Sequence, residues 1–158
     1  MKHRILVLNG PNLNLLGQRE PDIYGILTLE QINQLMLEHL GQREFGLGEF
    51  ELDFCQSNHE GVLIDTLHAA QGEYCGVIFN PAAYTHYSIA IRDALAAITV
   101  PVVEVHLSDI RSREAFRHDS LISDVAAATF MGKGAGSYLE ALDFLTNLVT
   151  SDLVGHLE

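Results

Sequence analysis

The stretch RILVLNGPNLNLLGQREPDIYG, from Arg4 to Gly25, decides how the rest of the chain is arranged. Ile5 to Leu8 form a short, continuous apolar run, which is typical of a strand buried on both faces. Gly10 and Pro11 end that strand at once, and the loop that follows continues to Gly25. Long ordered loops are often lids or binding loops. The polar residues of this loop also suit plain turn positions, so the loop alone leaves both interpretations open.

Length and composition define the class of protein. With 158 residues and 47% hydrophobic content, we expect a single domain over residues 1–158. No apolar run approaches about 18 residues and the N-terminus leads straight into a strand, so we expect no membrane span, no signal peptide and a cytoplasmic location. Cys55 and Cys75 have no CxxC spacing and are expected to be free thiols. The net charge of −12 makes nucleic acid and anionic membranes poor partners, and an anionic substrate would need a local basic patch.

The rest of the chain alternates expected strands with expected helices. Beyond the first strand, strands are expected over residues 49–55, 75–79, 101–106 and 125–131, and the last of these also suits a short helix. Alternating charge in residues 49–55 indicates an edge strand. Helices are expected after the capping box Thr28-Leu29-Glu30-Gln31, over residues 59–71 and 88–98, and from 136 onward, with a tail that frays over 151–158. This alternation predicts an α/β fold, a flavodoxin-like three-layer sandwich whose five-stranded parallel sheet has the order 2-1-3-4-5.

Polar side chains follow the expected strands. In open parallel sheets, ligands bind beyond the carboxyl ends of the strands, near the point where the strand order reverses. Asn12 follows the first strand, Asn80 ends the third and His106 ends the fourth. We therefore expect these three side chains to converge on one pocket.

Glu104 and His106 lie two residues apart on one strand, so their side chains point to the same face. A carboxylate beside an imidazole favours the charged ring, as a general acid requires near neutral pH. A purely structural ion pair at the end of the sheet explains the same pattern, and the sequence does not choose between the two.

Tyr24 is the second candidate for proton transfer. A free phenol has a pKa of about 10 and needs roughly 4 kcal/mol of help to ionise at neutral pH. Arg19 on the same loop, with Arg113 and Arg117 after the fourth strand, offers cations that favour ionisation. A surface tyrosine on a mobile loop is the alternative interpretation.

Other motifs are less specific. The backbone amides of Leu107 and Ser108, after the fourth strand, are suited to holding a carboxylate, whereas His86 also suits a plain helix start. The run GKGAG at residues 132–136 lacks the GxxxxGK[ST] pattern and is better explained as a turn before the last helix. The histidines show neither HxxxH nor HExxH spacing and no acidic cluster resembles a magnesium site, so we expect no metal and no cofactor.

Four blocks of the sequence carry a family resemblance. They are GPNLNLLGQREPDIYG (10–25), QSNHEG (56–61), NPAAYTHYSIAIRDAL (80–95) and EVHLSDIRSREAFRHDS (104–120). In this order they span nearly the whole chain and closely resemble the type II 3-dehydroquinate dehydratases, flavodoxin-like enzymes of the shikimate pathway. The resemblance implies a hydro-lyase that removes water from 3-dehydroquinate by anti elimination through an enolate, giving 3-dehydroshikimate without a covalent intermediate.

The resemblance also implies a role for each matching residue. Tyr24 takes the C2 proton, Arg19 closes over the substrate, Asn12 holds a water that stabilises the enolate oxygen, and His106, oriented by Glu104 and Asn80, protonates the leaving C1 hydroxyl. The remaining expected contacts are the Leu107 and Ser108 amides with the substrate carboxylate, His86 and Arg117 with ring hydroxyls, Arg113 as a further arginine of the motif, and Asp93 in the site of a neighbouring subunit. The family assembles as dodecamers, built as tetrahedral sets of trimers, and this chain is expected to do the same.

One position departs from the family pattern. Asp109 stands where the family usually has asparagine, beside the expected carboxylate pocket. Its charge would weaken substrate binding unless it points away or pairs with Arg111 or Arg113. One alternative function that stays open is therefore a scaffold disabled by Asp109. A second, independent alternative is a flavodoxin-like FMN carrier, against which the absence of tryptophan counts.

Overall fold

The central feature of the computed structural model, which describes residues 2–45 and 48–155, is a parallel sheet. Within these residues the sheet has five strands in the order β2-β1-β3-β4-β5, as predicted. The strands are β1 (Lys2–Asn9), β2 (Glu49–Gln56), β3 (Gly76–Asn80), β4 (Val102–His106) and β5 (Ala128–Met131). The segment 125–131, which suited either a strand or a short helix, thus forms a strand over its last four residues.

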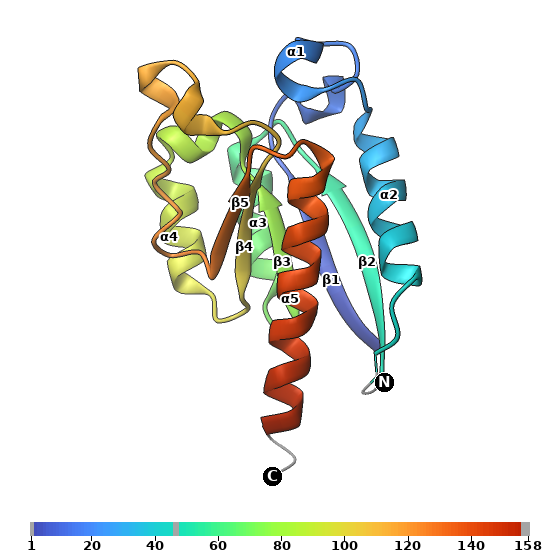
Figure 1. The fold of residues 1–158 in the computed structure, drawn as a ribbon. Helices are drawn as coiled ribbons and strands as arrows, with labels where there is room; N and C mark the ends of the chain where they lie inside the picture. Colours follow the sequence, from blue (N-terminus) through green and yellow to red (C-terminus); the bar gives the residue numbers. More distant parts are fainter. Residues whose placement is uncertain (1, 46–47, 156–158) are drawn as a thin grey trace.

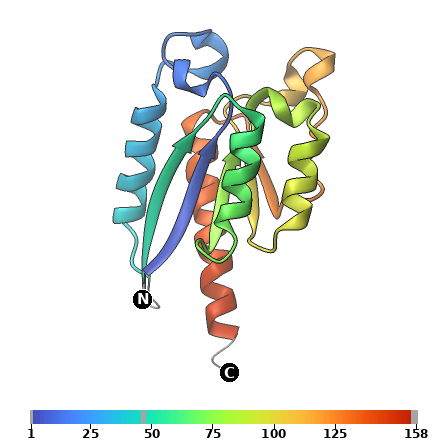
Figure 2. The same ribbon diagram turned by 180° about the vertical axis from the view of Figure 1, so that it is seen from behind.

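Helices cover both faces of the sheet, which gives the predicted three layers. Helices α2 (Leu29–Gly41) and α5 (Ala135–Gly155) lie on the face that is nearer the viewer in Figure 1. Helices α3 (Glu60–Ala70) and α4 (Ile89–Ala97) lie on the opposite face (Figure 2). The short helix α1 (Pro21–Tyr24) and the 3-10 turns η1 (Leu13–Leu15), η2 (Ala82–His86), η3 (Ile110–Ser112) and η4 (Ala115–Arg117) lie in the connecting loops.

Alternation along β1 divides the core into two clusters. Ile5 and Val7 pack with α2 and α5, whereas Leu6 and Leu8 pack with α3 and α4. All four side chains are buried, so the continuous apolar run does form a strand covered on both faces. The two core clusters hold the helices rigidly against the sheet and leave its carboxyl-end loops to carry the polar residues.

Local signals set several helix ends. The Thr28 hydroxyl accepts from the backbone N–H of Gln31 at 3.2 Å, and the Gln31 side chain accepts from the N–H of Thr28 at 2.9 Å, so the predicted capping box is present. At the other end of the chain α5 continues through Gly155, beyond Ser151, where we expected fraying to begin. Residues 156–158 of that expected tail lie outside the described residues.

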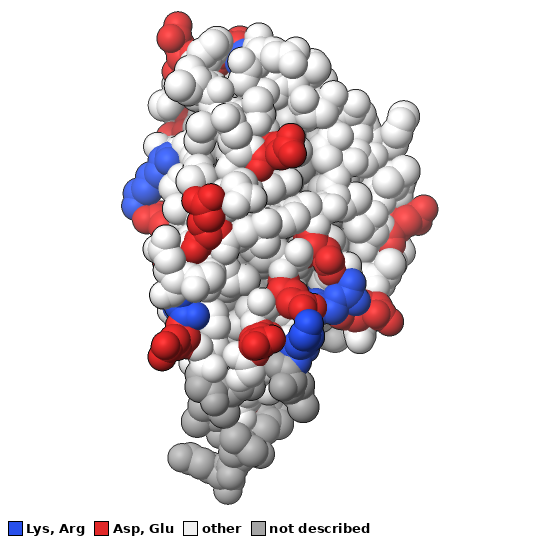
Figure 3. Space-filling model, turned by 90° about the vertical axis from the view of Figure 1, so that its right-hand side faces the viewer, with Lys and Arg blue, Asp and Glu red and all other residues white. Residues whose placement is uncertain are grey.

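The face formed by α2 and the β2 edge is acidic, and its basic side chains lie beside acidic ones (Figure 3). Two basic side chains of β1 pair with acidic ones of the edge strand β2, Lys2 with Glu51 and Arg4 with Asp53, the latter at 2.7 Å. β2 is half-buried along most of its length and lies at the edge of the sheet, as its charge alternation predicts. In the part of the chain that the structure describes, no helix is both long and apolar enough to cross a membrane.

Candidate active site

The predicted site residues come together beyond the carboxyl ends of the strands, at the upper end of the molecule in Figure 1. A small cavity of about 100 Å³ lies there, between the loop after β1 and the segment after β4. Among the predicted residues its lining includes Asn12, Arg19, Tyr24, Asn80, His86, His106, Leu107, Ser108, Arg113 and Arg117. Three of the chain's nine basic residues thus face one cavity, which gives this acidic protein the local basic patch that an anionic ligand needs.

The loop after β1 is held in place by the end of β2. Asn12 adopts a left-handed conformation, with φ of 65°, and its backbone N–H donates to the Asn58 side-chain oxygen at 2.9 Å. The Gln56 side chain donates to the same oxygen at 3.0 Å and to the Gly10 carbonyl at 3.2 Å. The QSN sequence at the end of β2 therefore supports the loop that carries Asn12 and does not line the cavity itself.

Tyr24 ends α1, above the cavity, with its phenol between two arginines. Arg19 donates to the phenol oxygen at 3.2 Å, and Arg113, from the segment after β4, donates to it at 3.1 Å. Both guanidiniums also lie over the ring, at 4.5 Å and 5.3 Å from its centroid. Positive charge therefore lies beside the oxygen that would carry the negative charge of a phenolate.

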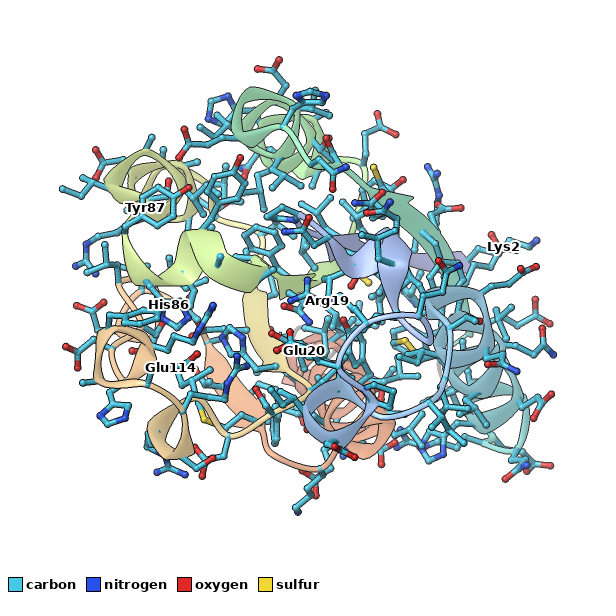
Figure 4. The ribbon with its side chains drawn as sticks, turned by 90° about the horizontal axis from the view of Figure 1, so that it is seen from above. Lys2, Arg19, Glu20, His86, Tyr87 and Glu114 are labelled. Atoms are coloured by element: carbon cyan, nitrogen blue, oxygen red, sulfur yellow. The ribbon has the colours of Figure 1, made fainter. Side chains whose placement is uncertain are left out.

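Arg113 contributes more than the sequence indicated. The sequence offers Arg113 and Arg117 alike as cations for Tyr24; in the structure the Nη1 of Arg113 contacts the Tyr24 phenol and also lies 3.4 Å from the Ser108 hydroxyl. It therefore joins the loop after β1 to the segment after β4. In Figure 4, which looks down on the site, Arg19 lies near the centre, with His86 and Glu114 to one side and Lys2 and Tyr87 at the periphery.

Glu104 and His106 form the predicted pair on β4. The Nε2 of His106 lies 2.6 Å from Oε1 of Glu104, and both side chains are buried. With Nε2 directed at the carboxylate, the other ring nitrogen is free to serve the cavity that His106 lines. The carboxylate is fully buried, so an uncompensated charge there would be costly.

Hydroxyl groups from three other segments compensate that charge. The Thr85 hydroxyl donates to Glu104 at 2.6 Å, that of Ser120 at 2.7 Å and that of Thr129 at 3.2 Å. Sequence reasoning missed all three. Thr129 is the one that strand register could have found, because it pairs directly with Glu104 across β4 and β5.

These contacts govern the protonation of the buried groups. Burial raises the pKa of Glu104, but the hydrogen bonds from His106, Thr85 and Ser120 outweigh it and hold the pKa below the ordinary 4.5. Burial lowers the pKa of His86 from 6.5, in spite of its hydrogen bond with the Asp119 carbonyl. The carboxylate is therefore charged and the His86 ring neutral at pH 7.

Asn80 ends β3 with its side-chain amide fixed by the protein. Its oxygen accepts from the backbone N–H of Ala82 at 3.0 Å, and its nitrogen donates to the buried phenol of Tyr138 at 2.8 Å. Asn80 and His106 both line the cavity, but the hydrogen bonds described for Asn80 run to Ala82 and Tyr138, whereas those of His106 run to Glu104. The expectation that Asn80 orients His106 stays a prediction.

Two further residues singled out in the sequence, Asp93 and Asp109, lie outside the cavity lining. Asp93 is exposed on α4 and is absent from the cavity lining of its own chain. Asp109 binds Arg111 through both oxygens at 3.0 Å and also accepts from the Arg111 backbone N–H, which caps η3. Arg111 lowers the pKa of Asp109. The departure from the family pattern thus carries its own counter-charge in Arg111.

In the described part of the chain, no three His, Cys, Asp or Glu side chains group closely enough to hold a metal ion. The turn at residues 132–136 leads into α5, and Gly132 and Gly134 have φ of 86° and 57° there. Its Lys133 pairs with Glu140 on α5.

Comparison with known proteins places this geometry in a family. The model of the family described as dehydroquinase class II matches residues 3–146. This chain belongs to that family. Among curated relatives, the 3-dehydroquinate dehydratase of Ruegeria pomeroyi is 52% identical over 141 residues, covering 89% of this chain and 91% of that protein. The 3-dehydroquinate dehydratase of Gloeothece citriformis is 54% identical over 137 residues, covering 87% of each.

Solved structures agree with this placement among the class II dehydroquinases. The type II dehydroquinase of Butyrivibrio crossotus superposes with a TM-score of 0.85 at 41% identity, covering 92% of this chain and 98% of that one. The type II dehydroquinase of Propionibacterium acnes gives a TM-score of 0.84 at 40% identity, with coverage of 93% and 98%. The flavodoxin-like sheet order of this chain is therefore that of its family.

Proposed function

We propose that this chain is a 3-dehydroquinate dehydratase, a hydro-lyase that converts 3-dehydroquinate to 3-dehydroshikimate in the shikimate pathway, toward chorismate and the aromatic amino acids. One observation carries the proposal. A phenol between two guanidiniums and an imidazole on a buried carboxylate line the same small cavity. A base and an acid placed on one ligand are what an elimination needs.

Tyr24 acts as the base that removes the C2 proton. The hydrogen bonds from Arg19 and Arg113 stabilise the negative charge that the phenol oxygen carries before it takes the proton. Electrons from the C2–H bond then form the enolate, whose oxygen is stabilised by a water held at Asn12. Arg19 is placed to close over the substrate because it lies on the same loop as Tyr24.

His106 acts as the acid in the second half of the reaction. The enolate collapses, the C1–O bond breaks and His106 gives its proton to the departing hydroxyl, which leaves as water. Glu104 holds the ring by its Nε2 and so fixes the orientation in which His106 faces the substrate. No electron acceptor is needed, since the elimination leaves the oxidation state of the molecule unchanged.

The remaining lining residues bind the substrate. The amides of Leu107 and Ser108 hold its carboxylate, assisted by the positive charge of Arg113 beside the Ser108 hydroxyl. His86 and Arg117 bind ring hydroxyls, and Asn80 completes the set from the end of β3. A neutral His86 suits this role because it neither repels the cationic residues nor competes for the anion.

An absorbance assay tests the proposal. Wild-type protein, stripped of metal, should convert 3-dehydroquinate with a rise in ultraviolet absorbance as the conjugated enone forms. Tyr24→Phe should abolish that rise while keeping the circular dichroism and melting temperature of wild type. Tyr74→Phe is the matched control, because the Tyr74 hydroxyl accepts from Arg4 and lies away from the cavity, and this variant should keep activity. Near-full turnover by Tyr24→Phe would show that another group is the base.

We propose further that twelve single-domain copies assemble as a tetrahedral set of trimers, with Asp93 reaching a neighbouring site. Tyr87 and Ile89 support an interface near Asp93, because these large apolar side chains are 63% and 65% exposed at the start of α4. Light scattering after size-exclusion chromatography should then give twelve times the chain mass of 17.4 kDa. A monomeric mass would refute the proposed assembly and leave the proposed reaction mechanism unaffected.

A cytoplasmic location completes the proposal. Cys55 and Cys75 are both free thiols in the structure, which suits a reducing compartment. Cell fractionation that finds the protein with extracellular material would contradict this location.

A further inference from the structure

A buried polar network lies on the face of the sheet opposite to Glu104. Asn9 and Asn80 are register partners at the ends of β1 and β3, and their side chains point toward α5, as do those of Val7 and Ile78 two residues earlier. Tyr138, in the first turn of α5, places its phenol between them. Neither Asn9 nor Tyr138 has a part in the mechanism above.

The direction of the hydrogen bonds in this network is determined by a backbone group. The N–H of Ala82 donates to the Asn80 side-chain oxygen at 3.0 Å, and a backbone N–H has no other role than donor. The Asn80 nitrogen must therefore face Tyr138, whose hydroxyl accepts from it at 2.8 Å. The phenol proton is then left for the Asn9 side-chain oxygen, at 2.7 Å.

Burial makes this chain of hydrogen bonds stable. Tyr138 is fully buried, and Asn9 and Asn80 are nearly so. Burial also raises the pKa of Tyr138, so its hydroxyl stays a donor throughout the working pH range. Each of these groups would be left unsatisfied in the core if the phenol oxygen were removed.

The packing of α5 against β3 sets the position of the Tyr138 phenol along that strand. Gly76, at the start of β3, leaves room for Leu145, since a Cβ there would lie 2.7 Å from the leucine methyl carbons. The helix therefore runs close along β3, with Leu145 at one end of the strand and Tyr138 over Asn80 at the other. The position of the phenol thus depends on a helix–strand contact at the far end of the strand.

We propose that Tyr138 is a positioning residue that locks the Asn80 amide so that it presents an N–H to the substrate. An asparagine amide has two N–H donors and one oxygen. Tyr138 takes one donor and the oxygen accepts from the Ala82 N–H, so the second donor is available to the cavity that Asn80 lines. Asn80 therefore selects a ligand oxygen with a free lone pair. This inference rests on the proposed function only in taking 3-dehydroquinate as that ligand.

A kinetic test uses a double-mutant cycle. Tyr138→Phe should lower kcat/KM by about tenfold, as loss of one well-placed hydrogen bond to the substrate does. Starting from Asn80→Ala, the same Tyr138→Phe change should lower kcat/KM by less than about twofold, because the group through which it acts is gone. Thr146→Val is the matched control: it removes another fully buried hydroxyl of α5, one that contacts Arg43 and lies away from the cavity, and kcat/KM should not change.

Two kinetic outcomes would overturn the inference. One is a Tyr138→Phe enzyme with wild-type kcat/KM. The other is an equal loss from Tyr138→Phe with and without Asn80, which would show that the phenol supports only the fold.

A second readout does not depend on activity. In proton–nitrogen spectra, the Asn80 side-chain amide is identified by its absence in Asn80→Ala. In wild type one of its two protons should exchange with solvent at least about tenfold more slowly than the other and show a nuclear Overhauser effect to the Tyr138 ring. In Tyr138→Phe that protection should vanish, and if this variant does not fold the wild-type spectrum decides alone. Two rapidly exchanging protons would refute the lock, whereas a protected proton in a wild type without dehydratase turnover would refute the function and leave the lock standing.

Discussion

Replacing Glu104 by glutamine removes a negative charge from beneath His106 while keeping the shape of the side chain. Oε1 of Glu104 accepts from His106, Thr85 and Ser120, and Oε2 accepts from Thr129. A glutamine oxygen can keep the three bonds at the first position. Its nitrogen can donate one N–H to the Thr129 hydroxyl at the second, so each polar atom of the new side chain keeps a partner and the variant should fold.

The expected loss of activity in Glu104→Gln comes from removal of the negative charge alone. Hydrogen bonds to charged groups contribute about 1.5–3 kcal/mol and neutral ones about 0.5–1.5 kcal/mol, a difference of about 1.5 kcal/mol. This corresponds to about a tenfold decrease in kcat at pH 7, because His106 gives up its proton in the proposed second step.

The assay is initial-rate absorbance with 3-dehydroquinate from pH 5 to 10, with Glu140→Gln as control. Glu140 is a carboxylate of α5 that pairs with Lys133 and lies outside the cavity. Its loss should leave kcat and the pH profile unchanged. A Glu104→Gln enzyme with wild-type kcat would refute the reasoning and leave Glu104 as a structural group.

The same variant should change the response to acid. The pKa of Glu104 lies below 4.5 in the folded protein, so its stabilising contribution is complete above 4.5 and is lost as the pH falls through the lower, folded value. Urea unfolding between pH 3 and 6 should show the free energy of unfolding of wild type falling more steeply below pH 4.5 than that of Glu104→Gln. Parallel curves would contradict the assigned direction.

Two further substitutions and one titration test separate parts of the structure. Asp109→Asn should change kcat/KM by less than about twofold, because the Asp109 charge is already balanced by Arg111. A large rise in kcat/KM on this substitution would instead support the hypothesis of a scaffold disabled by Asp109. Gly10→Ala should lower the melting temperature by several degrees, since the new Cβ would lie 2.7 Å from the Pro81 carbonyl oxygen, and an unchanged melting temperature would disprove that close approach. The ring of His86 should titrate in NMR spectra with a midpoint below 6.5, because burial disfavours its charged form, and a midpoint above 6.5 would contradict a neutral ring at pH 7.

Local patterns in the sequence were sufficient for the architecture. The apolar run of β1, the capping box at Thr28 and the alternation of β2 each depend on residues within a few positions of one another. Periodicity of this kind is a property of neighbours along the chain, so it can be read without knowing the fold. The parallel order then follows from the handedness of the crossovers, which few topologies satisfy.

The same local rules predicted part of the site. Glu104 and His106 point to one face because they are two apart on a strand, and Asn12, Asn80 and His106 meet because parallel strands end at one edge. Arg19 reaches Tyr24 from five residues away on one loop. These are short-range or sheet-level consequences, and a strand assignment suffices to derive them.

Only the tertiary structure decided which distant groups complete these pairs. Arg113 contacts the Tyr24 phenol across 89 positions of sequence, and Tyr138 reaches Asn9 across 129. Such contacts depend on where whole helices and loops pack. The position of Tyr138 along β3, for example, is set in part by the missing Cβ at Gly76, and no sequence periodicity encodes it. The sequence by itself thus determined the sheet, its order and the edge where the polar residues gather. Packing determined which hydroxyls, guanidiniums and phenols hold those residues in position, because a side chain's partners are chosen in three dimensions.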